Sequence, residues 1–163
     1  PSQGGVVSVT EFVTDGTVNV VPSTVTLRGD TRSFTPEVQT RIKSGMKRVA
    51  EGICAAHGAA CDFRYRSVFD PTVNNPAETE IAAKAARAVV GADQVTDVFQ
   101  PPMTSEDFAF MLQARPGCYV LLGNDGDGPG GCGLHNPEYD FNDAILTTGA
   151  DFWVSLVESV LPT

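Results

Sequence analysis

Hydrophobic and polar residues alternate along the first third of the chain, as they do in β-strands with one covered face. The two alternating runs are residues 4–13 (GGVVSVTEFV) and residues 23–34 (STVTLRGDTRSF), and both are rich in β-branched side chains. Successive side chains of a strand point to opposite faces, so Arg28, Asp30 and Arg32 fall on the same face of the second run. The pattern predicts two β-strands joined by the loop between these runs.

Helical periodicity begins directly after the second run. Apolar residues recur at spacings of three and four and give one hydrophobic stripe, which consists of Val38, Ile42, Met46, Val49, Ile53 and Ala56. Thr35 and Pro36 are favourable at a helix start, and the pair His57-Gly58 provides a glycine terminus. The sequence therefore predicts a long amphipathic helix between these signals, followed by a further strand over residues 61–69 (CDFRYRSVF).

A turn-rich stretch with two prolines, DPTVNNP at residues 70–76, marks a boundary in the chain. Beyond it, helical and strand patterns alternate. The predicted elements are a helix over residues 76–90, a short strand over 94–100, a helix that begins at Ser105, a buried strand over 117–123 and a last helix from about 142 to about 161. The chain is therefore expected to consist of a β-rich α+β part followed by an α/β part.

The composition is that of a globular protein without a surface for polyanions. Hydrophobic residues make up 42% and charged residues 19% of the 163 residues, and the net charge is −9. Nucleic acids and anionic membranes attract clustered Lys and Arg, so this charge argues against both as partners. No apolar run approaches the ~20 residues of a membrane-spanning helix.

The cysteines are too few for a disulfide scaffold, and no two of them form a CxxC pair. They are Cys54, Cys61, Cys118 and Cys132. The expected setting is therefore reducing and cytoplasmic. Cys54 and Cys61 flank a predicted helix end and could pair there, but the plainer interpretation is that the cysteines are small buried hydrophobic residues.

One histidine stands in a segment dense in polar residues, GLHNPEYDFND at residues 133–143. His135 follows a glycine-rich loop that leaves the predicted buried strand, and ligands usually bind at the carboxyl ends of strands in α/β sheets. Its imidazole could bind a divalent metal ion or could be a hydrogen-bonded structural residue of the loop. A catalytic zinc site needs about three protein ligands. Only one other histidine exists, His57 at a helix end in the other part, so most ligands would have to come from elsewhere.

Two further pairs of polar residues admit both a structural and a functional interpretation. Glu106 and Asp107 lie at a predicted helix start, where acidic residues favour the helix dipole, and a role at a site is the alternative. Asn19 and Arg32 could together bind a carboxylate, because an arginine fork and an amide donor suit that group. The plainer alternative pairs Arg32 with Asp30 on the strand surface.

Five segments, taken in order along the chain, resemble a family of metal-dependent amidohydrolases and peptidases. The segments are VNVVPSTVTLRGDTRSF, PTVNNP, MTSEDFAFM, YVLLGN and LHNPEYDFND. The family includes hippurate hydrolase, auxin-conjugate hydrolase, N-acyl-amino-acid amidohydrolases and carboxypeptidase G. The resemblance runs along the whole chain, and five segments in the right order are far more specific than any one of them.

The resemblance implies a two-domain enzyme. Residues 1–72 look like the later part of an α+β, ferredoxin-like lid domain that mediates dimerisation. Residues 73–163 look like the C-terminal part of an α/β catalytic domain, a zinc-aminopeptidase-like three-layer sandwich. Both domains would be incomplete in this chain, so the expected partners are a second copy bound through the lid and the missing N-terminal portion.

The resemblance also assigns roles to residues. His135 matches the family's last metal ligand, and the expected cofactor is one or two divalent ions, zinc or manganese. Asn19 and Arg32 match lid positions that bind the carboxylate of the substrate. Gly123 falls where backbone close to the substrate is expected.

The family's other metal ligands, its general base and its oxyanion-stabilising histidine have no counterpart in this sequence. Glu106 and Asp107 lie near the site by resemblance, without a defined role. The expected function is that of the C-terminal portion of an enzyme that hydrolyses hippurate-like N-acyl-amino-acid amides with metal-activated water, and this portion alone is expected to be inactive. The alternative is a non-catalytic dimerisation or ligand-binding module derived from the lid.

Overall fold

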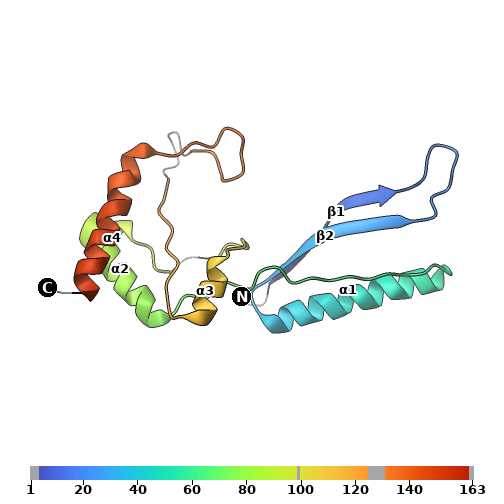
Figure 1. Ribbon diagram of the computed structural model, residues 1–163, viewed down its shortest axis with the longest axis horizontal. Coiled ribbons are helices and arrows are strands. Elements are labelled where there is room, and N and C mark those ends of the chain that lie inside the picture. Colours follow the sequence, from blue (N-terminus) through green and yellow to red (C-terminus); the bar gives the residue numbers. More distant parts are fainter. Residues whose placement is uncertain (1–3, 99, 125–130, 162–163) are drawn as a thin grey trace. The chain divides into compact units, whose positions relative to one another are not determined.

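The computed structural model describes residues 4–98, 100–124 and 131–161. It divides the chain into two compact units. Unit 1 comprises Pro1–Pro71 together with Pro102–Glu106, and unit 2 comprises Thr72–Pro101 together with Asp107–Thr163. Unit 1 contains a two-stranded sheet and one long helix, whereas unit 2 contains only helices among its described elements (Figure 1).

Unit 1 is built on an antiparallel hairpin. Strand β1 (Gly5–Thr14) pairs with strand β2 (Val25–Ser33), which confirms the first two predicted strands. A β-bulge interrupts the register just after Val9, which lies opposite Gly29. A Cβ added at Gly29 would collide with the carbonyl oxygen of Ser8, so the bulge needs glycine at this position.

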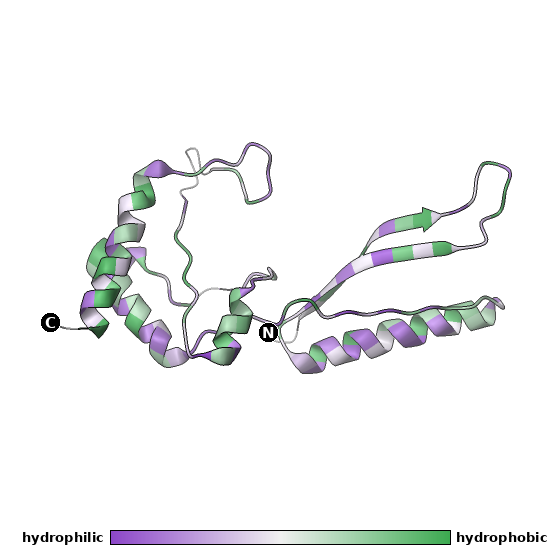
Figure 2. Ribbon diagram, viewed as in Figure 1, coloured by the Kyte–Doolittle hydropathy of each residue, from purple (hydrophilic) through white to green (hydrophobic). Residues whose placement is uncertain are grey.

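Helix α1 (Pro36–Ala56) begins and ends where the sequence predicted. The Thr35 hydroxyl accepts a hydrogen bond from the Val38 N–H at 3.3 Å. At the other end His57 is the C-cap, and Gly58 adopts a φ of 69° that suits glycine. Hydrophobic and hydrophilic residues alternate along this helix (Figure 2), which contacts both strands. Neither α1 nor any other helix in the described ranges is long and apolar enough to cross a lipid bilayer.

Unit 2 is organised by two helices that lie side by side (Figure 1), α2 (Pro76–Val90) and α4 (Leu146–Val160). Ala82 and Ala85 of α2 are buried, and the Ser155 hydroxyl of α4 donates a hydrogen bond to the Ala85 carbonyl at 3.4 Å. The described 3-10 helices of this unit are η1 (Ala92–Gln94) and η3 (Asp143–Ile145). The helix predicted over residues 76–90 is confirmed, and the last predicted helix corresponds to η3 and α4 together.

Helix α3 begins later than the sequence predicted. It comprises Phe108–Ala114, and its N-cap is Asp107, whose side chain makes no capping hydrogen bond. The expected start at Ser105 is wrong, because the residues just before Asp107 belong to unit 1. There the Met103 carbonyl accepts a hydrogen bond from the Arg32 guanidinium, which holds this segment outside the helix.

Three predicted strands are wrong within the described residues. They are segments 61–69, 94–100 and 117–123, of which Phe99 lies outside the described residues. A strand needs a neighbour with which its N–H and C=O groups pair, and the described part of the chain forms one sheet of two strands. Segment 61–69 is instead attached by side chains, since the Tyr65 and Thr31 hydroxyls share a hydrogen bond of 2.7 Å.

The expected burial of segment 117–123 is also wrong. Val120, Leu121 and Leu122 are 46%, 61% and 51% exposed. Among the described residues, the buried hydrophobic core consists of Ala82, Ala85 and Ala109. Large apolar side chains of unit 2 are therefore accessible along this segment.

The four cysteines are free, and none of them is buried. The interpretation as small buried hydrophobic residues is therefore wrong, because the buried core in the described ranges is formed by alanines alone. Cys54 and Cys61 are neighbours. Partial desolvation, and then the hydrogen bond between the two thiols, raise the pKa of Cys61.

Candidate functional site

Two adjacent asparagines hold the segment that the sequence predicted as a buried strand. The Asn74 side chain accepts a hydrogen bond from the Tyr119 N–H at 2.8 Å and donates one to the Tyr119 carbonyl at 2.9 Å. The Asn75 N–H donates to the Gly117 carbonyl at 2.9 Å. These hydrogen bonds fix the start of segment 117–123 to the beginning of α2.

Asn124 fastens the far end of this segment to the loop that carries His135. The Asn124 amide donates to the Asp140 carbonyl at 3.0 Å and to the Tyr139 hydroxyl at 3.2 Å. Its oxygen accepts a hydrogen bond from the Asn142 N–H at 2.9 Å. Asn124 was not among the residues predicted from the sequence, although a polar residue directly after an apolar run was a signal for it.

His135 lies in a tight turn of that loop. The Asn136 N–H donates to the Gly133 carbonyl at 3.2 Å, and the Tyr139 N–H donates to the Asn136 carbonyl at 2.9 Å. His135 has a φ of 69° and is the only non-glycine residue with positive φ among those described. Its side chain is exposed and makes no hydrogen bond or ion pair with another described residue. The imidazole is therefore accessible to a ligand.

The described residues do not complete a metal site around His135. In the described part of the chain, no three His, Cys, Asp or Glu side chains gather in a way that could hold a metal ion. One imidazole falls short of the three or so protein ligands of a catalytic zinc site. The described residues thus offer a single candidate ligand and do not by themselves support metal chemistry.

Arg32 lies on an accessible face of β2 and is held by two acceptors. Its Nε donates to Asp30 at 2.8 Å, and its Nη1 donates to the Met103 carbonyl. The surface pairing with Asp30, which the sequence left open as an alternative, is therefore present. The two side chains remain 44% and 56% exposed, so the ion pair stabilises the fold by only about 0–1 kcal/mol. The guanidinium stays within reach of a ligand.

Asn19 lies in the loop between the two strands. Thr17 and Val20 close this loop with reciprocal backbone hydrogen bonds of 3.2 and 3.1 Å. The Asn19 side-chain oxygen accepts a weak hydrogen bond from the Thr17 hydroxyl at 3.4 Å. The side chain is exposed, so its amide is available to a ligand.

Asp15 organises the base of the same loop. Its carboxylate accepts hydrogen bonds from the Ser23 hydroxyl and, at 3.1 Å, from the Thr24 N–H. The bond from Ser23, followed by that from Thr24, lowers the pKa of Asp15. Both bonds therefore favour the ionised form of the carboxylate that ties this loop together.

The structure does not bring Asn19 and Arg32 together within one chain. Arg32 is paired with Val6 near the start of β1, whereas the loop leaves the hairpin at the pair Thr14 and Val25. Seven residues of strand at about 3.3 Å each place roughly 23 Å between the base of the loop and Arg32. The loop lies at the end of the hairpin opposite to the start of β1 (Figure 1).

The remaining predicted site residues are Gly123, Glu106 and Asp107. Gly123 is exposed, and apart from its chain neighbours no atom of the described residues lies within 4 Å of the position that its Cβ would take, so a ligand can approach this backbone. Glu106 is half-buried at the end of the unit 1 segment Pro102–Glu106. Asp107 is exposed at the start of α3 in unit 2. These two neighbouring acids therefore belong to different units.

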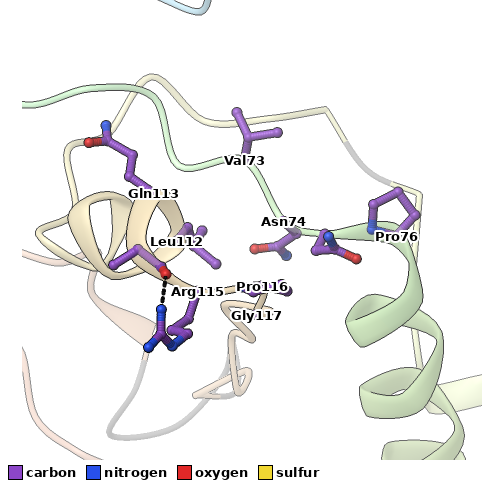
Figure 3. A pocket seen from close by; sticks show the side chains of 10 residues that line it. Val73, Asn74, Pro76, Leu112, Gln113, Arg115, Pro116 and Gly117 are labelled. Atoms are coloured by element: carbon purple, nitrogen blue, oxygen red, sulfur yellow. Dashed lines mark hydrogen bonds between the residues drawn. The ribbon is translucent and has the colours of Figure 1, made fainter.

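A pocket of about 460 Å³ lies in unit 2 between the start of α2 and the end of α3 (Figure 3). Its one ionisable side chain is Arg115, which donates to the Ala114 carbonyl at 2.9 Å. None of the predicted site residues lines the pocket. Its lining contains no acid, imidazole or nucleophile, so the pocket is a weaker candidate for a catalytic site than the His135 loop.

Comparison with known proteins places the whole chain in one family. Residues 4–159 match the family described as Peptidase family M20/M25/M40. N-acetylcysteine deacetylase of Bacillus subtilis is 31% identical over 161 residues, which are 99% of this chain and 40% of that protein. Hippurate hydrolase of Campylobacter jejuni is 26% identical over 156 residues, which are 96% of this chain and 40% of that protein. The chain thus spans about two fifths of the length of these curated relatives.

A solved structure gives the same result for the fold. The crystal structure of the Bacillus subtilis YXEP protein, described as a dinuclear metal binding peptidase from the M20 family, is similar with a TM-score of 0.80 and 30% identity. The alignment covers 98% of this chain and 42% of that chain. The α/β fold, with a small sheet and four α-helices in the described part, is therefore similar to that of M20 peptidases. The resemblance predicted from five short segments is confirmed, and the chain belongs to Peptidase family M20/M25/M40.

Proposed function

We propose that this chain is the C-terminal part of a metal-dependent amidohydrolase that cleaves the amide bond of N-acyl amino acids, including hippurate-like compounds. The observation that carries the proposal is the family match over residues 4–159. The names N-acetylcysteine deacetylase and hippurate hydrolase both describe substrates with an acylated amino group, which supports this substrate class. Because the chain spans about two fifths of these relatives, the activity is proposed for the complete protein.

His135 is proposed as one ligand of a site for one or two divalent ions, zinc or manganese. Its exposed imidazole supports this role, as does the description of the YXEP protein as a dinuclear metal binding peptidase. A divalent metal supplies Lewis acidity and activates water when it is bound. The other ligands and the general base are proposed to lie in the part of the family's length that this chain does not cover.

The two units are proposed to be incomplete domains. Unit 1 would be the later part of a ferredoxin-like lid, and unit 2 the C-terminal part of a zinc-aminopeptidase-like three-layer sandwich. The exposed side chains of Val120, Leu121 and Leu122 support this proposal, because an apolar run of this kind suits a strand buried in a sheet. In the complete sandwich, strands from the rest of the protein would pair with this segment.

The substrate carboxylate is proposed to lie between Arg32 of one chain and Asn19 of the partner subunit. A separation of roughly 23 Å along one hairpin prevents both side chains from hydrogen bonding to the same carboxylate. A homodimer formed through unit 1 supplies the second residue. The exposed apolar side chains Val9, Phe12 and Leu27 of the hairpin, at 63%, 70% and 58%, support burial of this unit against a partner.

Residues 1–163 alone are proposed to be inactive, because one imidazole neither fixes a catalytic metal nor supplies a general base. The alternative, a non-catalytic dimerisation or ligand-binding module derived from the lid, makes a different prediction for the complete protein. A single hydrolysis assay of the complete protein therefore distinguishes the two functions.

The experiment measures hydrolysis of hippurate and of N-acetyl amino acids by the complete protein, with zinc or manganese added. We expect turnover that a chelator abolishes and added metal restores, and no turnover from residues 1–163 alone. If the complete, folded protein binds these compounds but hydrolyses none of them with either metal, the non-catalytic module is the better account.

A further inference from the structure

Asn124 uses its whole side-chain amide on the residues that follow His135. One N–H is directed to the Asp140 carbonyl at 3.0 Å and the other to the Tyr139 hydroxyl at 3.2 Å. The amide oxygen accepts a hydrogen bond from the Asn142 N–H at 2.9 Å. An asparagine amide has two N–H donors and one oxygen, so this arrangement fixes the side chain in one orientation.

The residue that Asn124 binds through its hydroxyl closes the turn that directly follows the turn around His135. Tyr139 follows His135 by four residues, and its N–H donates to the Asn136 carbonyl at 2.9 Å. The Tyr139 ring packs edge-to-face against Phe141, with ring centroids 5.2 Å apart. The hydrogen bond from Asn124 therefore holds a residue of the adjoining turn, which shares Asn136 with the turn around His135.

The backbone of His135 needs such support. Its φ of 69° is uncommon for a residue with a Cβ and persists only where the surroundings fix it. A loop released from Asn124 would gain access to other backbone conformations, in which the imidazole would point in other directions. The geometry thus links the side chain of Asn124 to the orientation of His135.

We propose that Asn124 is a positioning residue for His135, which it keeps in a single orientation without touching substrate or metal. The inference rests on the proposed function, in which His135 is a metal ligand. Residues that orient a metal ligand typically change metal affinity by about 10–100-fold when they are removed. The same order of effect is expected at Asn124.

Asn74 provides a matched control for the structural contribution of an asparagine. Its side chain is also fully engaged, in two hydrogen bonds to the Tyr119 backbone and a third that it donates to the Cys118 Sγ at 3.3 Å. It fixes the beginning of segment 117–123, whereas Asn124 fixes the residues beyond its end. Replacement of Asn74 should therefore lower stability without reaching the turn around His135.

The experiment titrates zinc alone into the metal-free complete enzyme and into its Asn124→Ala, Asn74→Ala and His135→Ala variants, with a chelator as competitor. We expect Asn124→Ala to lower zinc affinity about 10–100-fold and to recover most of its kcat at saturating zinc. Asn74→Ala should lower the Tm and leave zinc affinity unchanged. Asn124→Asp keeps the acceptor for the Asn142 N–H but not the donor to Asp140, so its affinity should be intermediate, and it replaces the alanine variant if that does not fold.

The outcomes separate this inference from the proposed function. If the Asn124 variants lose no more zinc affinity than Asn74→Ala while His135→Ala does lose affinity, then Asn124 is only structural and the inference is overturned. If His135→Ala also keeps the affinity of the wild type, the assignment of His135 as a ligand is wrong, and the inference is overturned together with it.

Discussion

Asn19 and Arg32 stand at opposite ends of one hairpin, because Arg32 pairs with Val6 while Asn19 lies in the loop beyond Thr14 and Val25. The family resemblance implied that both residues bind the carboxylate of the substrate. The roughly 23 Å of strand between them makes this impossible within one chain, and a homodimer is the simplest arrangement that permits it. The expected dimer can therefore be tested by measuring whether residues of two different chains complete one substrate site.

Mixing two weakened variants is therefore expected to restore activity. Asn19→Ala and Arg32→Ala, each tested alone in the complete enzyme, should raise KM for N-acyl amino acids, because each removes one contact to the carboxylate. A heterodimer of the two variants, purified with two different tags, retains one site with both residues. The proposed wild-type homodimer has two such sites, so we expect the heterodimer to show about half of the wild-type activity.

Arg28→Ala is the matched control for this experiment. Arg28 lies on the same face of β2 as Arg32, and its guanidinium pairs with Glu11 at 2.7 Å. Its replacement should leave KM close to that of the wild type. If the heterodimer is no more active than either parent variant, the two residues act within one chain or do not bind the substrate.

The bulge in the hairpin gives a stability prediction. Gly29→Ala should destabilise the protein by about 1–3 kcal/mol, because the added Cβ collides with the Ser8 carbonyl. Gly45→Ala in α1 is the control, since outside the helix's own backbone and the chain neighbours no atom of the described residues lies within 4 Å of its added Cβ, and alanine in a helix interior should stabilise by about 0.5–1 kcal/mol. Thermal unfolding of the two variants should therefore shift Tm in opposite directions. Equal shifts would show that the bulge does not require glycine.

The lowered pKa of Asp15 gives a pH prediction. A carboxyl group whose pKa is lower in the folded protein contributes stability above its unfolded pKa, and this contribution is lost as the pH falls through the folded pKa. Asp15→Asn removes the charge, so its Tm should lie below that of the wild type at pH 7. The difference between the two proteins should shrink as the pH falls from about 5 towards the lowered pKa. A difference that stays constant down to pH 3 would contradict the assigned hydrogen bonds.

Helix ends could be predicted from the sequence because their signals are local. Thr35 caps α1 through the N–H of Val38, three residues away, and Gly58 ends it with a positive φ. Asn75 caps α2 in the same way through the Ala77 N–H at 3.1 Å. Each signal depends on atoms within a few residues of the chain, so composition and spacing were sufficient to find it.

Three of the five predicted strands, and the burial of segment 117–123, were wrong because strand pairing and burial depend on distant partners. Segment 117–123 has the apolar pattern of a buried strand, yet its start is bound to Asn74 and Asn75, and its large side chains are exposed. The predicted start of α3 was wrong for a similar reason, because Arg32 of β2 binds the Met103 carbonyl far along the chain. The pattern of hydrophobic and polar residues alone does not predict these contacts.

In the candidate site, too, features with local signals could be predicted, whereas features that depend on distant contacts could not. His135 could be proposed from the sequence because its loop follows an apolar run and is rich in glycine and polar residues. The contacts of Asn124 were not predicted, because its partners Tyr139, Asp140 and Asn142 become neighbours only through the fold. The distance between Asn19 and Arg32 likewise follows from the pairing of the two strands and not from either residue.

The assignment of His135 is tested most directly by the metal content of the complete enzyme, compared between His135→Ala and His57→Ala. His57 is the other histidine of the chain and lies exposed at the end of α1, so its replacement is expected to change nothing. We expect His135→Ala to lose bound metal and hydrolysis of hippurate together, while His57→Ala retains both. Full metal content and full activity in His135→Ala would contradict the account.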